Sequence, residues 1–159
     1  MSDKMTVPRR QMILWLGGAA VANAQDAAIA NTRAIHQEED FKASPSRIYE
    51  GLLDTRQFTA LSGGLAASIQ REAGGTFSLF DGHIVGRNLE LESNRRIVQA
   101  WRAVTWPEGI FSIARFELTA QGSGTRMVFD HTGFPPALAE SLLSGWKDHY
   151  WAGLRKYLG

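Results

Sequence analysis

The chain has no cysteine among its 159 residues, which excludes disulfide bonds, thiolate metal sites and a cysteine nucleophile. It also has almost no excess charge, because 17 Lys and Arg face 16 Asp and Glu. Overall charge therefore gives no reason to expect nucleic acid or an anionic membrane as a partner. Its apolar run at residues 12–22 is shorter than the ~20 residues of a membrane-spanning helix, so no stable span is expected.

What the chain does contain is ordinary for one globular domain. Hydrophobic residues make up 44% and charged residues 21% of the sequence, which is too apolar for a disordered protein. A length of 159 residues suits a single domain with its own core. The sequence has 16 glycines and five tryptophans, a mixture that favours turn-rich β-sheet over a helical bundle.

The N-terminal segment differs from the rest. Lys4, Arg9 and Arg10 precede the apolar run, and the small-residue site Ala22-Asn23-Ala24 follows it. This order of basic, apolar and small residues is the layout of a secretory signal. The arginine pair resembles a twin-arginine export signal, although the flanking residues match that motif only in part.

We therefore expect residues 1–24 to be a cleaved signal peptide and residues 25–159 to be the mature domain. Such a protein would be exported, with the periplasm as its destination, and a twin-arginine signal points to a bacterium. If the signal does not function, the protein stays in the cytoplasm.

The first part of the mature chain predicts one strand and two short helices. Residues 32–43 alternate in polarity and favour a strand. Apolar residues at helical spacing after Pro45 predict a short helix, and Asp54 can cap a second helix over residues 55–61.

Beyond residue 65 the pattern changes to short strands separated by turn residues. The predicted strands are residues 66–72, 76–80, 83–92, 95–106, 111–121 and 125–132. Asp81-Gly82 predicts a two-residue hairpin. Residues 137–158 predict one long helix, with these residues along its apolar side: Leu142, Trp146, Tyr150, Gly153, Leu154 and Tyr157. The fold class expected is α+β, an antiparallel sheet covered by the C-terminal helix.

Several stretches together resemble a known family. They are Phe41–Tyr49, Gly74–Gly82, Leu89–Leu91, Arg95–Arg102, Gly124–His131 and Gly145-Trp146. The chain resembles the START-like (SRPBCC, Bet v 1-like) superfamily over about residues 33–158. Within that superfamily it is similar to the AHSA1-like family, named for the activator of Hsp90 ATPase. The resemblance implies a helix-grip fold, a seven-stranded antiparallel sheet around a long C-terminal helix, with an apolar cavity between them.

Sequence motifs for catalysis or metal binding are missing. The four histidines, His36, His83, His131 and His149, do not form an H-E-x-x-H pattern, and neither a G-x-S-x-G nor a phosphate-loop motif occurs. We therefore expect no metal and no cofactor. His131 lies on the same strand face as Met127 and Phe129, where it is either a hydrogen-bonded core residue or a general acid or base.

Apolar and aromatic side chains that this fold would turn inward make up the expected ligand site. The site residues are Phe77, Leu79, Gln99, Trp101, Phe116, Phe129, His131, Trp146 and Tyr150. A pocket of this kind, with few polar groups, is typical of a small-molecule site. The alternative is that the aromatic residues simply fill the core, and that Gln99 bonds to a neighbouring strand.

Three functions remain open. The first is binding of a hydrophobic small molecule or lipid without catalysis. The second is a cyclase- or hydrolase-like enzyme that uses the same cavity, with His131 as acid or base. The third, implied by the resemblance, is an Hsp90-activator-like co-chaperone domain with a protein partner. An export signal argues against the third function, because Hsp90 would be in another compartment.

Overall fold

The computed structural model describes residues 34–159. The predicted signal peptide, residues 1–24, lies outside this range. The elements in chain order are β1 (Ala34–Phe41), α2 (Pro45–Leu53), α3 (Thr55–Leu61), β2 (Ser68–Ile69), β3 (Thr76–Leu79), β4 (Ile84–Glu92), β5 (Arg96–Ala103), β6 (Ser112–Gln121), β7 (Gly124–Thr132), η1 (Pro136–Leu138), α4 (Ala139–Gly145), η2 (Trp146–Trp151) and α5 (Ala152–Leu158). Within the described residues, no helix has both the length and the apolar character to cross a membrane.

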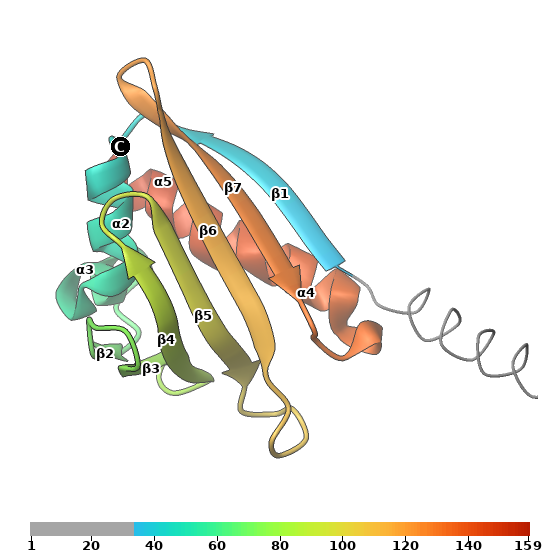
Figure 1. Ribbon diagram of the computed structural model, residues 1–159. Helices are drawn as coiled ribbons and strands as arrows, with labels where there is room; N and C mark the ends of the chain where they lie inside the picture. The colour runs from blue at the N-terminus through green and yellow to red at the C-terminus, as the bar shows by residue number, and fades with distance from the viewer. Residues whose placement is uncertain (1–33) are drawn as a thin grey trace, which may run out of the picture. The chain divides into compact units, whose positions relative to one another are not determined.

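The seven strands form one antiparallel sheet in the order β1-β7-β6-β5-β4-β3-β2. The first strand pairs with the last, and the intervening strands follow as successive neighbours. The helical C-terminal segment runs across one face of the sheet, and α2 and α3 lie at the side (Figure 1). The predicted fold class is confirmed: a seven-stranded antiparallel sheet, a long C-terminal helix and two short helices after the first strand.

Both short helices begin at side-chain caps. The Ser44 hydroxyl accepts a hydrogen bond from the backbone N–H of Arg47, and Pro45 occupies the first helical turn. The Asp54 carboxylate accepts from the N–H of Gln57 at 2.9 Å. Each cap satisfies one of the free N–H groups at a helix start, so the prediction that Asp54 caps a second helix is confirmed.

The C-terminal segment is helical from residue 136 to residue 158, but its middle part, η2, is a π-helix. A π-turn holds one more residue than an α-turn. Trp146, Tyr150 and Trp151 are therefore all buried against the sheet. Simple helical spacing placed Tyr157 on the buried side and left out Trp151, and this was wrong: Tyr157 is 37% exposed and Trp151 is fully buried. The extra residue in the π-turn changes which of the following helix residues face the sheet.

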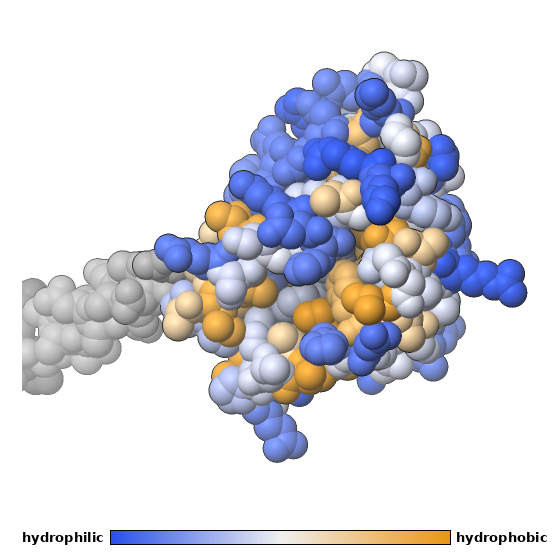
Figure 2. Space-filling view, turned by 180° about the vertical axis from the view of Figure 1, so that it is seen from behind, coloured by the Kyte–Doolittle hydropathy of each residue, from blue (hydrophilic) through white to orange (hydrophobic). Residues whose placement is uncertain are grey.

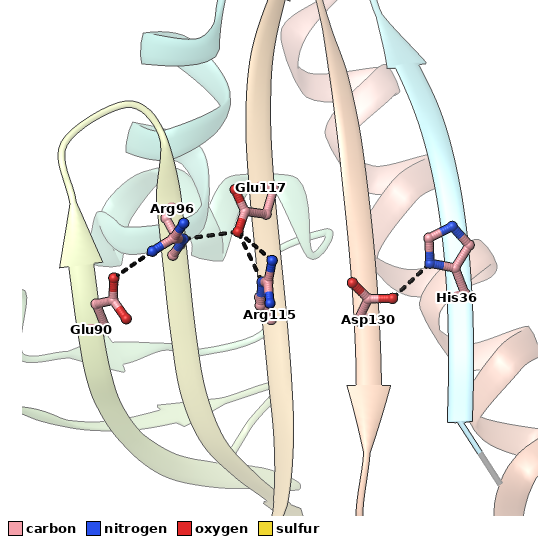
Figure 3. A network of polar contacts seen from close by, with 6 residues as sticks. All are labelled: His36, Glu90, Arg96, Arg115, Glu117 and Asp130. Atoms are coloured by element: carbon pink, nitrogen blue, oxygen red, sulfur yellow. Dashed lines mark hydrogen bonds and ion pairs between the residues drawn. The ribbon is translucent and has the colours of Figure 1, made fainter.

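The two faces of the sheet differ in chemistry. Alternate residues of β5 and β7 turn inward as predicted, whereas the outer face carries charged side chains. Figure 3 shows Arg96 between Glu90 and Glu117, and His36 beside Asp130 on the β1–β7 pair. These pairs are exposed or half-buried, so solvent screens them and each contributes little to stability.

Two local predictions were wrong in detail. The expected strand over residues 66–72 is reduced to the two residues of β2. The β3–β4 connection is a four-residue turn, because pairing stops at Leu79 and Ile84. Phe80, Asp81 and Gly82 all have positive φ there. The left-handed turn therefore begins one residue earlier than the Asp-Gly pair, and this directs the Phe80 ring toward the C-terminal helix, 5.2 Å from the Tyr150 ring.

We predict that Gly86→Ala destabilises the fold. A β-carbon at Gly86 in β4 would lie 2.0 Å from the Ala100 carbonyl oxygen and 2.4 Å from the Phe77 ring. Overpacking of this kind costs about 1–3 kcal/mol. Gly145→Ala is the control, because it has no neighbour within 4 Å of a β-carbon and has helical backbone angles. Urea unfolding followed by tryptophan fluorescence compares the two, and equal stabilities would contradict the prediction.

Candidate functional site

The main cavity of the described residues has a volume of about 440 Å³ and lies between the C-terminal helix and the sheet. Its helix wall consists of Leu138, Ser141, Leu142, Gly145, Trp146, His149 and Tyr150. Opposite the helix lie Trp101 and Ala103 of β5, with Thr105 and Trp106 of the loop that follows β5. The β3–β4 turn, the start of β4 and the loop after α3 contribute the rest of the lining with Phe80, Asp81, His83, Ile84 and Leu65. This size and apolar lining are typical of small-molecule sites.

The cavity exists because the first part of the C-terminal helix packs loosely. None of the α4 side chains is fully buried, whereas η2 buries three aromatic residues one turn later. Leu138 and Leu142 are half-buried and face the space that a tighter contact would fill. Figure 2 shows this side of the molecule, where hydrophobic residues gather over the central and lower part and hydrophilic ones over the upper part.

Three of the nine predicted site residues line this cavity: Trp101, Trp146 and Tyr150. The other six are buried but do not line it: Phe77, Leu79, Gln99, Phe116, Phe129 and His131. The predicted site is therefore split between the cavity and the packed core beside it. A ligand contact by any of the nine remains a prediction.

Aromatic packing surrounds three of these six residues, Phe116, Phe129 and His131. The Trp146 ring is the centre of this cluster, with centroids 4.2 Å from Phe129, 4.2 Å from Tyr150 and 5.8 Å from Phe116. Trp151 stacks on Trp146 from the next position of the π-turn. Edge-to-face and tilted contacts of this kind add to the stabilisation from burial.

His131 is held by a chain of buried hydrogen bonds. The Trp146 indole N–H donates to Nδ1 of His131 at 3.0 Å, so Nδ1 carries the lone pair. The hydrogen of the neutral ring is then on Nε2, which donates to the Ser112 hydroxyl at 2.6 Å. Ser112 in turn donates to the Trp101 carbonyl oxygen at 2.9 Å. The imidazole has zero exposure, and burial lowers its pKa to about 4.

This arrangement does not favour catalysis by His131. A general base needs a lone pair that faces the substrate, and the only lone pair of this neutral imidazole accepts from Trp146. Ser112 was not singled out from the sequence, yet it forms a serine–histidine pair with His131. The pair lacks the acidic partner of a catalytic triad, because an indole stands at Nδ1. His131 is a hydrogen-bonded core residue.

Gln99 also finds its partner inside the sheet. Its side-chain amide donates to Oδ1 of Asn88 at 3.0 Å, and Asn88 donates to the Gln70 carbonyl oxygen at 3.0 Å. A β-bulge in β4 after Asn88 accompanies the inward orientation of the Asn88 side chain, which is fully buried. Gln99 therefore bonds to a neighbouring strand, as one of the two alternatives predicted.

One polar atom at the cavity differs from these satisfied groups. The Tyr150 hydroxyl accepts a hydrogen bond from the Trp101 indole N–H at 3.2 Å. Among the described residues, no side chain or backbone group accepts the hydroxyl hydrogen of Tyr150. The side chain is 5% exposed, and burial raises the pKa of this phenol. The group is therefore a neutral donor at the cavity wall.

Sequence reasoning missed much of the lining. Ala103 and Trp106 stood in a predicted strand that in fact ends at Ala103, so Trp106 folds back from the loop. Leu142 is a lining residue that the helical spacing of apolar residues did place on the inner side of the helix. The histidines of the rim, His83 and His149, come from elements far apart in the chain. Within residues 34–159, no cluster of three or more His, Asp or Glu side chains is placed to hold a metal ion.

We predict that His131 makes the fold sensitive to acid. Its pKa is about 4 in the folded chain and about 6.5 in the unfolded chain, so only the unfolded chain binds a proton between these values. The free energy of unfolding should therefore fall by roughly 3 kcal/mol from pH 7 to pH 4 through this residue. Urea unfolding of His131→Gln should show a flatter pH dependence. The exposed His83→Gln variant is the control, and equal slopes in wild type and His131→Gln would contradict the prediction.

Comparison with curated proteins finds activators of the 90 kDa heat shock protein ATPase. The chain is 27% identical over 128 residues to "Activator of 90 kDa heat shock protein ATPase homolog 1" of Homo sapiens, covering 80% of this chain and 38% of the relative. It is 30% identical over 117 residues to the activator homolog of Dictyostelium discoideum, covering 73% and 30%. The chain therefore spans about a third of the length of these relatives.

Solved structures show the same fold. An HSP90 activator from Plasmodium falciparum matches with a TM-score of 0.76 and 25% identity, over 79% of this chain and 96% of that chain. A protein from Chromobacterium violaceum matches with a TM-score of 0.64 and 22% identity, over 79% and 97%. The sequence profile of the family described as "Activator of Hsp90 ATPase homolog 1-like protein" matches residues 42–159. The chain belongs to this family.

Proposed function

We propose that residues 34–159 form a protein-interaction domain of the Hsp90-activator kind. The observation that carries this proposal is the family match over residues 42–159. A second support is that the domain accounts for 96% of a solved chain described as an HSP90 activator. The partner would be the Hsp90 of the same cell, and the activity a stimulation of its ATPase.

The loop between β5 and β6 is the contact surface that fits such a partner. Val104, Ile110 and Phe111 are all exposed there, and we call these three residues the loop patch. Arg102 fixes the loop, because its guanidinium lies 5.6 Å from the Phe111 ring centre and donates to the Trp106 carbonyl oxygen at 2.9 Å. Exposed apolar groups on a fixed loop bind a partner with a small loss of conformational freedom.

We predict that the chain stimulates Hsp90 ATPase through the loop patch. The double variant Ile110→Ser/Phe111→Ser should raise the concentration needed for half-maximal stimulation at least about tenfold, because two apolar contacts are lost. Tyr157→Ser is the matched control, since Tyr157 is as exposed as Ile110 and lies on α5. Steady-state ATP hydrolysis by Hsp90 at increasing concentrations of each chain measures the effect. A wild-type chain without stimulation would refute the proposal.

Binding of an apolar small molecule is a second candidate function. The observation that favours it is the cavity of about 440 Å³ with aromatic walls. Apolar surface buried there contributes about 25 cal/mol per Å² before the cost of association. Such a function needs no catalytic residue, which agrees with the hydrogen-bonded state of His131.

Location distinguishes the two functions. We also propose that residues 1–24 direct export, on the strength of the basic, apolar and small-residue order in the sequence. An exported chain would not meet Hsp90 and would instead use its cavity. A chain that keeps these residues in the cytoplasm would be free to bind Hsp90.

We predict that the protein purified from its own host begins at Gln25 and carries a discrete bound mass. Denaturing mass spectrometry gives the mass of the chain, and native mass spectrometry gives any additional mass that is released on denaturation. A chain cut after Ala24 with a bound molecule would support export and the second candidate function. A full-length chain without added mass would contradict both and leave the Hsp90 partner.

A further inference from the structure

The cavity contains a hydrogen-bond donor that the protein itself does not use. The Tyr150 hydroxyl accepts from the Trp101 indole N–H, and both side chains line the cavity. Its own hydrogen has no acceptor among residues 34–159. Burial keeps the phenol protonated, because its pKa is raised. A buried donor without an acceptor costs free energy, so a ligand that supplies an acceptor here gains more than it would in water.

The donor is also strengthened by its neighbour. The Trp101 N–H donates to the same oxygen that carries the free hydrogen, and hydrogen bonds arranged in sequence polarise one another. The Trp146 ring lies 4.2 Å from the Tyr150 ring and 5.4 Å from the Trp101 ring, and all three side chains are buried. The hydroxyl therefore has a fixed position, and only a ligand atom at one place in the cavity can accept from it.

The rest of the lining restricts the ligand further. Trp101, Trp106, Trp146 and Phe80 present aromatic surfaces, which favour flat, ring-containing molecules. No Lys or Arg lines the cavity, and Asp81 is its one carboxylate. An anionic group placed inside would lose its hydration without gaining a cationic partner. The lining therefore favours an uncharged ligand body over an anionic one.

We propose that the cavity binds a neutral, mainly aromatic molecule with one carbonyl oxygen, which accepts a hydrogen bond from the Tyr150 hydroxyl. This inference rests on the second candidate function, small-molecule binding in the cavity. It assigns Tyr150 as the residue that selects a carbonyl compound over a hydrocarbon of the same shape. A hydrocarbon of the same shape would leave the buried Tyr150 hydroxyl without an acceptor, and this cost lowers its affinity relative to the carbonyl compound.

The test uses two flat probes of nearly equal shape, fluorene and 9-fluorenone. They differ in one position, where fluorenone has a carbonyl group. Calorimetry should show fluorenone binding to the wild-type chain about tenfold more tightly than fluorene, as expected for one additional hydrogen bond. Tyr150→Phe should reduce the affinity for fluorenone to that for fluorene and leave fluorene binding unchanged. Fluorene-9-carboxylate should bind more weakly than either neutral probe.

A second readout does not depend on the stability of the variant. The infrared stretch of the fluorenone carbonyl should shift to lower wavenumber on binding to the wild-type chain, because the oxygen accepts a hydrogen bond.

Gly145→Leu should block both probes, since a side chain at Gly145 meets no atom within 4 Å of its β-carbon and extends from a cavity wall. Ser144→Leu is the matched control, an exposed neighbour that does not line the cavity.

Each outcome decides a separate point. Equal affinities of fluorene and fluorenone for the wild-type chain, or an unshifted carbonyl stretch, would overturn the role of Tyr150 and leave cavity binding in place. Binding of neither probe to the wild-type chain would overturn the cavity function and this inference together. Equal loss in Gly145→Leu and Ser144→Leu would show that the probes bind elsewhere, which overturns the inference.

Discussion

Contact between the aromatic face of the C-terminal helix and the inner face of the sheet supports the rest of the structure. One face of the seven-stranded sheet is apolar, and a single helix has to cover it. The π-turn meets this demand by turning Trp146, Tyr150 and Trp151 inward within six residues. The Trp146 and Trp151 rings reach Phe116 and Phe129 on two neighbouring strands. These contacts hold η2 against the sheet. The preceding segment, α4, has no buried side chain and lines the cavity.

The same anchor decides which polar groups are available for chemistry. Trp146 fixes the tautomer of His131, and Ser112 takes the remaining ring hydrogen. Asn88 satisfies Gln99 in a similar way on β4. On sequence alone, His131 and Gln99 were candidates for catalysis or ligand binding. In the folded chain both are engaged in internal hydrogen bonds. The hydroxyl of Tyr150 differs from these two groups, because its hydrogen has no acceptor among residues 34–159 and the residue lines the cavity.

Family and cavity point to different uses of one domain. Membership of the activator family favours a protein partner, and the loop patch offers an exposed apolar surface for it. The cavity lies on the helix side and favours a small molecule. These surfaces meet at Trp106, whose side chain lines the cavity and whose carbonyl oxygen fixes the loop through Arg102. Fold alone does not choose between them, since related scaffolds serve many functions.

Local periodicity, caps and turn residues were enough to predict the fold class, the order of the elements and the inward faces of the strands. The cap at Asp54 and the alternation of Met127, Phe129 and His131 are examples. The tertiary structure decided the site. Trp106 lines the cavity through a loop that folds back, and the π-turn depends on packing against the sheet rather than on helix propensity. Whether His131 is free or bonded depends on Trp146 and Ser112, which are brought to it from other elements. The hydrophobic periodicity of a single helix or strand does not reveal which residues of other elements will contact it.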